Sequence, residues 1–281
     1  MPIIETRHLR KVFRSVRRYP GVGGAIRSLF SREYVDKVAV EDINLVMEAG
    51  ELVGYIGPNG AGKSTTIKML TGILVPTSGE IRVAGLVPYQ KRKENARNIG
   101  VVFGQRSQLY WDLPLRESFE LLRAIYAVPR ARYEENLAFF LRENLKLDES
   151  EVERRVREMI QFAQLEGYED QLPDTLSGGM KKRLAIGRAL IFGPSMVLLD
   201  EPTVGLDPLS TKRILDVIQR LREERGLGAV FVTHLISDVE AIADSVLILF
   251  KGKIVFDDVP KAMHESDHPF VMSFLKQPEE A

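Results

Sequence analysis

Short apolar runs separated by turn-forming residues dominate the first hundred positions of the chain. The stretches "PIIETRHLRKVF" (2–13) and "VAVEDINLVMEAGELVGYIG" (38–57) carry the branched and alternating apolar positions that are typical of strands. Within the second stretch, "EAGE" predicts a turn between two strands. A helix is expected from Lys63, ending where glycine and proline gather in "TGILVPTSGE" (71–80). Further strands are expected at 80–85 and 98–105.

The middle of the chain changes to a helical and highly charged pattern. From Pro114 to about residue 165, segments such as "LRESFELLRAIY" and "EVERRVREMIQFAQL" place apolar residues three and four positions apart. After Pro173 the strand pattern returns. Strands are expected at 196–200, 228–234, 245–250 and 253–258, with a helix over 208–226.

This order of elements predicts an α/β domain interrupted by helices. The whole chain, 1–281, is expected to be a single domain with a mostly parallel sheet and an N-terminal antiparallel β region. Its parts are expected to be a core formed by 1–113 and 174–260, an inserted helical lobe at 114–173, and a C-terminal tail at 261–281.

An arginine-rich insertion at 14–36 separates the first two expected strands. Four of its apolar residues could share one helical face: Ile26, Leu29, Phe30 and Tyr34. The segment is expected to be either an amphipathic helix packed on its own domain or a basic element near a membrane surface or membrane partner.

Composition and charge restrict the class of protein. The 281 residues are 44% hydrophobic and 28% charged, which is ordinary for a soluble globular protein. The 39 basic and 39 acidic residues balance, and this argues against nucleic acid as a partner because phosphate binding usually shows as a basic excess. There is no cysteine, no signal-peptide pattern at the start, and no apolar run near the ~20 residues that span a bilayer. These features predict a cytosolic polypeptide.

A phosphate-binding loop is predicted between an apolar strand and a helix. The stretch Gly57–Ser64, "GPNGAGKS", satisfies the pattern G-x-x-x-x-G-K-[ST] in that context. The glycines let backbone N–H groups turn toward a phosphate, and the start of the helix adds a favourable field. Lys63 would supply a cation for the β- and γ-phosphates, and the Ser64 hydroxyl could bind Mg²⁺.

Later segments add candidate chemistry. The strand "MVLLDE" ends in Asp200, which could hold Mg²⁺, and Glu201, which could align and deprotonate an attacking water. The turn "LSGGM" (176–180) precedes a helical pattern and is a second possible anion-binding helix start. His234 closes the strand "AVFVTH"; alone, such a histidine is more often structural.

These segments, taken in order, resemble the motif set of ABC transporter ATP-binding subunits, and the resemblance covers essentially the whole chain. The matching positions are Gly57, Pro58, Asn59, Gly60, Ala61, Gly62, Lys63, Ser64, Thr65, Gln105, Leu176, Ser177, Gly178, Gly179, Leu199, Asp200, Glu201, Gly205, Asp207 and His234. The resemblance implies a P-loop NTPase core of the ABC type that hydrolyses ATP with Mg²⁺. It also implies two copies enclosing two ATP molecules.

The resemblance assigns further roles. In a dimer, Ser177, Gly178 and Gly179 of one copy would contact the γ-phosphate lying on Lys63 of the other copy. Gln105 would contact Mg²⁺ and the attacking water, Asp207 would lie at the dimer interface, and His234 would sense the γ-phosphate. Phe13 stands where the family stacks an aromatic ring on adenine, with Tyr19 as the alternative.

Two positions depart from the family pattern. Met180 stands where glutamine usually ends the signature, and Leu235 follows His234 where aspartate is more usual. The segment between Gln105 and Ser177 is also longer than the family leads us to expect for its helical lobe.

The resemblance further implies transmembrane permease subunits as partners and a position at the inner face of the cell membrane. The first half of the chain is similar to ATPases of drug, lipid or polysaccharide exporters, whereas the second half is similar to Mla-type lipid-trafficking ATPases. Tyr110, Trp111 and Leu113 are candidates for contacting a permease, or they pack inside the lobe. A soluble ABC ATPase acting in translation or DNA repair, and a module that binds nucleotide without hydrolysis, remain as alternatives.

Overall fold

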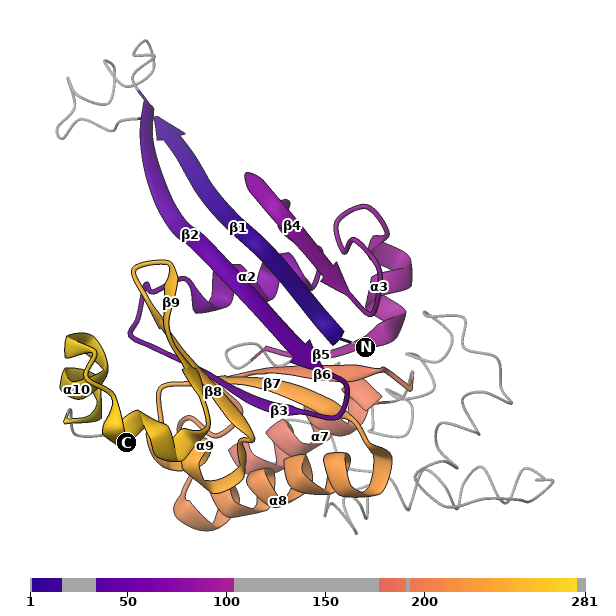
Figure 1. Cartoon of the computed structure of the whole chain (residues 1–281). Helices are drawn as coiled ribbons and strands as arrows, with labels where there is room; N and C mark the ends of the chain where they lie inside the picture. Colours follow the sequence, from indigo (N-terminus) through magenta and orange to yellow (C-terminus); the bar gives the residue numbers. More distant parts are fainter. Residues whose placement is uncertain (1, 17–33, 104–176, 191–192, 277–281) are drawn as a thin grey trace, which may run out of the picture.

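The computed structural model describes residues 2–16, 34–103, 177–190 and 193–276 (Figure 1). The expected helical lobe at 114–173 and most of the expected insertion lie outside these ranges. The same is true of Tyr19, Gln105 and the three candidate permease contacts at 110, 111 and 113.

An antiparallel region opens the fold. It contains β1 (Pro2–Val16), β2 (Tyr34–Glu48) and β4 (Ser78–Val83), and β1 pairs with both of the others. The pairing of β1 with β2 continues to Val16 opposite Tyr34, so the two strands project together from the body of the molecule (Figure 1).

The expected limits of the insertion, 14–36, therefore need correction. Both ends of that range belong to the hairpin, because Arg14 is paired with Asp36 and Val16 with Tyr34 in the strand register. Side chains support this pairing: Arg14 Nε lies 3.2 Å from Asp36 Oδ1, and the guanidinium lies 5.1 Å from the Tyr34 ring centroid. Such cross-strand pairs stabilise a sheet, and sequence spacing alone does not reveal them.

The remaining strands form a mostly parallel sheet. They are β3 (Leu52–Ile56), β5 (Ile99–Val102), β6 (Met196–Asp200), β7 (Gly228–Thr233), β8 (Ser245–Phe250) and β9 (Lys253–Asp258). Across the described residues, the two regions join into nine strands in the order β4-β1-β2-β9-β8-β3-β7-β6-β5. The pairs among β3, β5, β6, β7 and β8 are parallel, whereas β9 runs antiparallel to β8. The expected fold class is confirmed.

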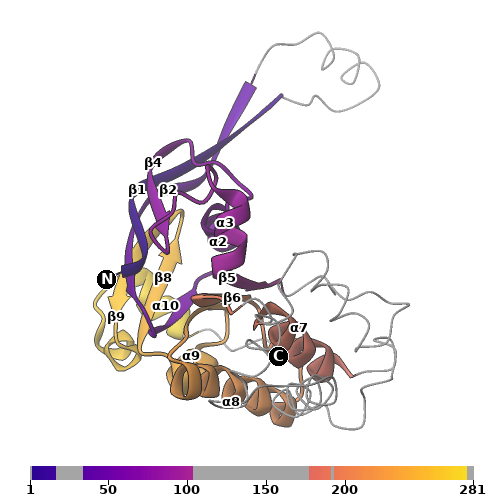
Figure 2. The same cartoon turned by 90° about the vertical axis from the view of Figure 1, so that its right-hand side faces the viewer.

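Helices cover both faces of this sheet (Figure 2). They are α2 (Lys63–Leu70), α3 (Arg92–Asn98), α7 (Gly178–Leu190), α8 (Pro208–Arg225), α9 (Ile236–Ile242), η2 (Pro260–Glu265) and α10 (Pro269–Leu275). The strand β3 is buried along its whole length, and alternate side chains enter two different cores. Val53 and Tyr55 pack with residues of α2, whereas Leu52 and Ile56 pack with residues of α7, α8 and α9.

The parallel register places the ends of three strands at one edge of the sheet. Ile56 at the end of β3 pairs with Thr233 at the end of β7, and Asp200 at the end of β6 pairs with Val232. The loops that follow these strands therefore emerge side by side. In open α/β sheets, ligands bind at this carboxyl edge.

The described part of the C-terminal tail packs on the core. Met263 of η2 and Val271 and Phe274 of α10 are buried in the same apolar cluster as α8 and α9. Aromatic stacking extends from the sheet to the tail, since the ring of Phe270 lies 3.9 Å from that of Phe250 and 5.6 Å from that of Phe274, centroid to centroid. The short helices of this region were not expected individually, because six or seven residues show too little periodicity.

No helix among the described residues is both long and apolar enough to cross a membrane.

Because α10 buries apolar side chains, we expect its packing to contribute measurably to the free energy of unfolding of the protein. Phe274→Ala should lower the free energy of unfolding by about 3 kcal/mol, because it removes a nearly buried ring from a packed cluster. Urea denaturation followed by circular dichroism measures this change. Met272→Ala on the exposed face of the same helix is the control and should stay within about 0.5 kcal/mol of wild type. Equal effects of the two changes would contradict the packing described above.

Candidate active site

The predicted phosphate loop connects β3 to α2, and two of its glycines are sterically required. Gly57 (φ 147°) and Gly62 (φ 114°) both have conformations that disfavour side chains. A Cβ at Gly57 would lie 2.2 Å from the carbonyl oxygen of Leu249, and one at Gly62 would lie 2.5 Å from that of Ala39. The loop therefore passes against the backbone of β8 and β2. No side chain caps the start of α2, so its first N–H groups remain available for an anion.

The lysine of the loop folds back over the loop itself. Lys63 Nζ donates to the carbonyl oxygen of Gly57 and, at 3.2 Å, to that of Pro58. The side chain is buried, and burial lowers the pKa of Lys63, while the charges of Glu201 and Asp200 oppose this shift. The ammonium group thus forms hydrogen bonds with the backbone of its own loop.

A buried hydroxyl chain holds the loop from behind. Tyr55 Oη donates to Thr66 Oγ1 at 3.2 Å, and Thr66 Oγ1 donates to the carbonyl oxygen of Gly62 at 3.2 Å. Complete burial raises the pKa of Tyr55, so it stays a neutral donor. This chain of hydrogen bonds was not predicted. The sequence offered only a threonine four residues after a loop glycine, the spacing at which a hydroxyl can donate to a backbone carbonyl.

Two carboxylates follow β6, and they sit in different surroundings. The pKa of Asp200 is raised by burial and by the charge of Glu201, and Lys63 and Lys68 partly offset this. Glu201 has φ 53°, which for a residue other than glycine costs about 1–2 kcal/mol. Its N–H donates to the carbonyl oxygen of Val232 at 2.8 Å, which ties this strained residue to β7.

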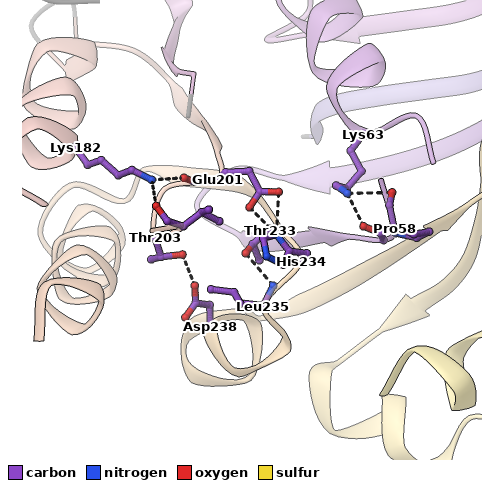
Figure 3. A network of polar contacts seen from close by, with 11 residues as sticks. Pro58, Lys63, Lys182, Glu201, Thr203, Thr233, His234, Leu235 and Asp238 are labelled. Carbon is purple, nitrogen blue, oxygen red and sulfur yellow. Dashed lines mark hydrogen bonds and ion pairs between the residues drawn. The ribbon is translucent and has the colours of Figure 1, made fainter. Parts of the chain in front are cut away.

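The histidine predicted from the end of β7 faces the second carboxylate. His234 Nδ1 lies 3.3 Å from Glu201 Oε1 and 3.2 Å from Oε2 (Figure 3). Although Oε2 is buried, it accepts no hydrogen bond. Leu235, which stands where the family pattern has aspartate, donates its N–H to Thr233 Oγ1 at 3.1 Å, and this contact orders the turn that carries His234.

Two helices hold the backbone after Glu201, and these contacts were not predicted from the sequence. Lys182 of α7 donates to the carbonyl oxygens of Glu201 and Val204, at 2.7 and 2.9 Å. Thr203 Oγ1 donates to Asp238 Oδ2 of α9, and both side chains are buried (Figure 3). No motif links these residues along the chain, because the contacts arise from three separate elements.

A cleft of about 880 Å³ collects most of the predicted loop residues and both carboxylates, whereas Gly57, Ala61 and His234 are not among the described residues that line it. One wall is the projecting hairpin, which contributes Phe13, Ser15 and Lys37. Phe13 is 39% exposed, so its ring is available for stacking. The predicted site residues that line this cleft are Phe13, Pro58, Asn59, Gly60, Gly62, Lys63, Ser64, Thr65, Asp200 and Glu201.

The signature residues lie outside this cleft. None of Ser177, Gly178 and Gly179 is among the described residues that line it. Ser177 Oγ accepts from the N–H of Met180 at 3.3 Å and caps the start of α7, so the cap does not depend on the side chain at position 180. A Cβ at Gly179 would come within 3.0 Å of Ser210, and glycine there lets α7 pack against the start of α8.

Asp207 caps α8 next to these residues. Its Oδ1 accepts from the N–H groups of Leu209 and Ser210, both at 3.0 Å. Hydrogen bonding with Ser210 is the largest cause that lowers the pKa of Asp207, so the cap is anionic at neutral pH. Asp207 does not line the cleft either.

A phosphate loop after a buried parallel strand, with an Asp-Glu pair at the end of a neighbouring strand, defines a P-loop nucleotide-binding protein. A profile of the ABC transporter family matches residues 40–204, more than half of the chain. The chain belongs to this family, and it is an ABC-type ATPase, the ATP-binding subunit of a transporter.

Similar proteins include both import ATPases and a protein with a lipid name. The methionine import ATP-binding protein MetN of Corynebacterium efficiens is 34% identical over 83% of this chain and 60% of its own length. The chloroplast protein TRIGALACTOSYLDIACYLGLYCEROL 3 of Arabidopsis thaliana is 32% identical over 86% of this chain and 70% of its own. Among solved structures, the dimeric post-hydrolysis cassette MJ0796, bound to ADP and Pi, has a TM-score of 0.67 and 26% identity, covering 92% of this chain and 98% of that one.

The raised pKa of Asp200 predicts that this carboxylate destabilises the ligand-free fold. The folded state favours the protonated acid, so its contribution to stability is lost as the pH rises through the folded-state pKa. Asp200→Asn should therefore raise the melting temperature at pH 7 in EDTA. The gain should shrink as the pH falls toward about 4, where about half of the acid is protonated even in the unfolded chain.

Differential scanning fluorimetry from about pH 4, near the unfolded value of an aspartate, to about pH 8 measures the effect. Asp267→Asn, at an exposed position, is the control. Its melting temperature at pH 7 should equal that of the wild-type chain. A lower melting temperature for Asp200→Asn at pH 7 would contradict the electrostatics of this site.

Proposed function

We propose that this chain is a motor subunit that binds ATP with Mg²⁺ in the described cleft, hydrolyses it between two copies, and drives membrane permease subunits. The observation that carries the proposal is the convergence of Lys63, Ser64, Asp200 and Glu201 on one cleft, beside a phosphate loop whose shape only glycine permits.

The donor set fits Mg²⁺. This ion prefers oxygen ligands and usually combines one or two protein groups with substrate phosphates. The Ser64 hydroxyl and the Asp200 carboxylate line the same cleft and are the two protein groups proposed to hold it, with Gln105 as the third from outside the described residues. No three acidic or histidine side chains gather into a metal site in the described part of the chain, so the phosphates would complete the coordination. When bound, the ion neutralises phosphate charge.

The proposed reaction is in-line attack of water on the γ-phosphate. Glu201 would orient and deprotonate that water through its carboxylate, whose two oxygens lie 3.3 and 3.2 Å from His234 Nδ1. The ammonium group of Lys63 would give up its hydrogen bonds to two loop carbonyl oxygens and donate to phosphate oxygens instead. His234, 3.2 Å from Glu201, would contact the γ-phosphate and hold the carboxylate in place. Phe13 would stack on the adenine.

A second copy completes the proposed site. Ser177, Gly178 and Gly179 form a capped helix start that lies outside the cleft of their own chain, and Asp207 lies beside them at the start of α8. This arrangement supports their contact with nucleotide held by a partner copy. The cassette MJ0796, which this chain resembles, is dimeric in two solved structures, and this supports a dimer of the present chain.

The membrane partner is proposed to be a permease of an exporter or of a lipid, polysaccharide or drug translocator, with the chain peripheral on the cytoplasmic face of the membrane. The relatives include methionine importers, so they do not favour export. The lipid name of the Arabidopsis relative supports the alternative, an Mla-type phospholipid-trafficking ATPase. Nucleic acid is not a proposed partner, because the net charge is zero.

Replacing the proposed base separates binding from hydrolysis. Glu201→Gln should lower the rate of phosphate release by about 10²- to 10⁴-fold, the usual contribution of a positioned general base. The variant should still bind ATP and accumulate as a dimer, measured by light scattering during size-exclusion chromatography. Glu223→Gln, at an exposed position of α8, should keep wild-type turnover. Normal phosphate release by Glu201→Gln would overturn the assignment.

The permease can be sought through the proposed contact residues. Affinity purification of the chain from detergent-solubilised membranes, followed by mass spectrometry, should recover a polytopic partner. Trp111 lies outside the described residues. The variant Trp111→Ala should reduce the recovery of this partner and leave basal ATP hydrolysis within about twofold of wild type. Recovery equal to that of wild type would contradict the proposed contact.

A further inference from the structure

A lysine outside the family motifs bridges two elements of the site. Lys182 lies in the second turn of α7, whose first residues are the signature glycines. Its Nζ reaches across to the segment between β6 and α8, where it donates to the carbonyl oxygens of Glu201 and Val204 at 2.7 and 2.9 Å (Figure 3). One side chain therefore connects the signature helix to the backbone of the proposed catalytic glutamate.

The two hydrogen bonds form in partly buried surroundings. Burial lowers the pKa of Lys182, and the negative charge of Glu201 opposes the shift. A charged donor withdrawn from water forms stronger hydrogen bonds than a solvated one. The bridge is thus more than a surface contact of a mobile lysine.

The backbone that Lys182 holds is the strained one. Glu201 has φ 53°, a left-handed conformation that a residue with a Cβ adopts only when its surroundings impose it. Its N–H is held by the carbonyl oxygen of Val232 in β7, and its carbonyl oxygen is held by Lys182. Both backbone polar groups of Glu201 are therefore fixed, and this fixes the direction in which its carboxylate leaves the chain toward His234.

We propose that Lys182 is a positioning residue that maintains Glu201 in the conformation required for hydrolysis and links that glutamate to the signature helix α7. The proposal rests on the proposed function. Because the start of α7 would contact nucleotide held by the second copy, the bridge lets that contact act on the glutamate facing the chain's own nucleotide. The two sites of the dimer would be coupled through one ammonium group.

The rest of the segment has an independent anchor. The Thr203 hydroxyl donates a hydrogen bond to the Asp238 carboxylate of α9, and this hydrogen bond does not involve Lys182. Loss of the lysine should therefore loosen the carbonyl side of Glu201 without releasing the whole segment.

The test compares ATP turnover and ATP binding in the full chain. Lys182→Met should lower kcat by about 10- to 100-fold, the usual cost of misplacing a catalytic group, and leave the Kd for ATP in EDTA within twofold. Lys182→Arg, which keeps a cation with several donors, should recover most of the rate. Lys212→Met, at an exposed position of α8, is the matched control. A kcat of Lys182→Met within twofold of this control would overturn the proposal.

A double-mutant cycle distinguishes positioning from a general structural role. If Lys182 acts through Glu201, Lys182→Met should cause no further loss of single-turnover rate in the Glu201→Gln background. Full additivity of the two losses would overturn the proposal. If Lys182→Met does not fold, Lys182→Gln takes its place, because the shorter amide side chain cannot reach both carbonyl oxygens. A wild-type kcat for Lys182→Gln would overturn the proposal.

Hydrogen exchange tests the bridge without turnover. Exchange of the backbone amides in 200–206 should be faster in Lys182→Met than in Lys212→Met, with no nucleotide present. Equal exchange overturns the inference whether or not the chain hydrolyses ATP. If the wild-type chain releases no phosphate but this difference is seen, the proposed function has failed and the positioning of Glu201 stands.

Discussion

The site depends on opposite charges held together in partly buried surroundings at the end of parallel strands. Lys63, Asp200 and Glu201 line one cleft, and burial disfavours the charged forms of the lysine and of Asp200. The two carboxylates partly compensate Lys63, and Lys63 partly compensates Asp200, whereas the charge of Glu201 adds to the cost of ionising Asp200. A ligand with phosphate oxygens and a divalent cation would complete this compensation, so the ligand-free fold carries electrostatic cost that binding would release.

Close backbone packing makes this arrangement possible. The loop between β3 and α2 passes against the carbonyl oxygens of Leu249 and Ala39, and no residue larger than glycine fits at the two contacts. The turn between β8 and β9 adds a further restraint, because the N–H of Gly252 donates to the carbonyl oxygen of Ala61 at 3.0 Å. The loop is therefore shaped by strands that are distant in sequence, and the shape exists before any phosphate arrives.

The segment after β6 connects the cleft to the rest of the molecule. It leaves the sheet at Asp200, turns at the strained Glu201, and ends at the Asp207 cap of α8. Helix α7 holds it through Lys182 and helix α9 through Asp238. Signature helix, carboxylates and histidine turn are thus parts of one hydrogen-bonded unit. This unit is the structural basis for expecting that contacts at α7 influence chemistry at Glu201.

The sequence alone determined the phosphate loop and the positions of the core strands along the chain, because these depend on local spacing and apolar periodicity, and the ordered set of motifs determined the family. Residues 196–200 match β6 without error, since a short apolar run ending in acids has few other interpretations. Only the tertiary structure decided which side chains of different elements contact one another. Tyr55 and Thr66 behind the loop, Lys182 across to Glu201, and the paired ends of the hairpin all depend on contacts between distant segments. Such contacts leave no periodic signal, because the side chains that form them meet only after the sheet has aligned its strands.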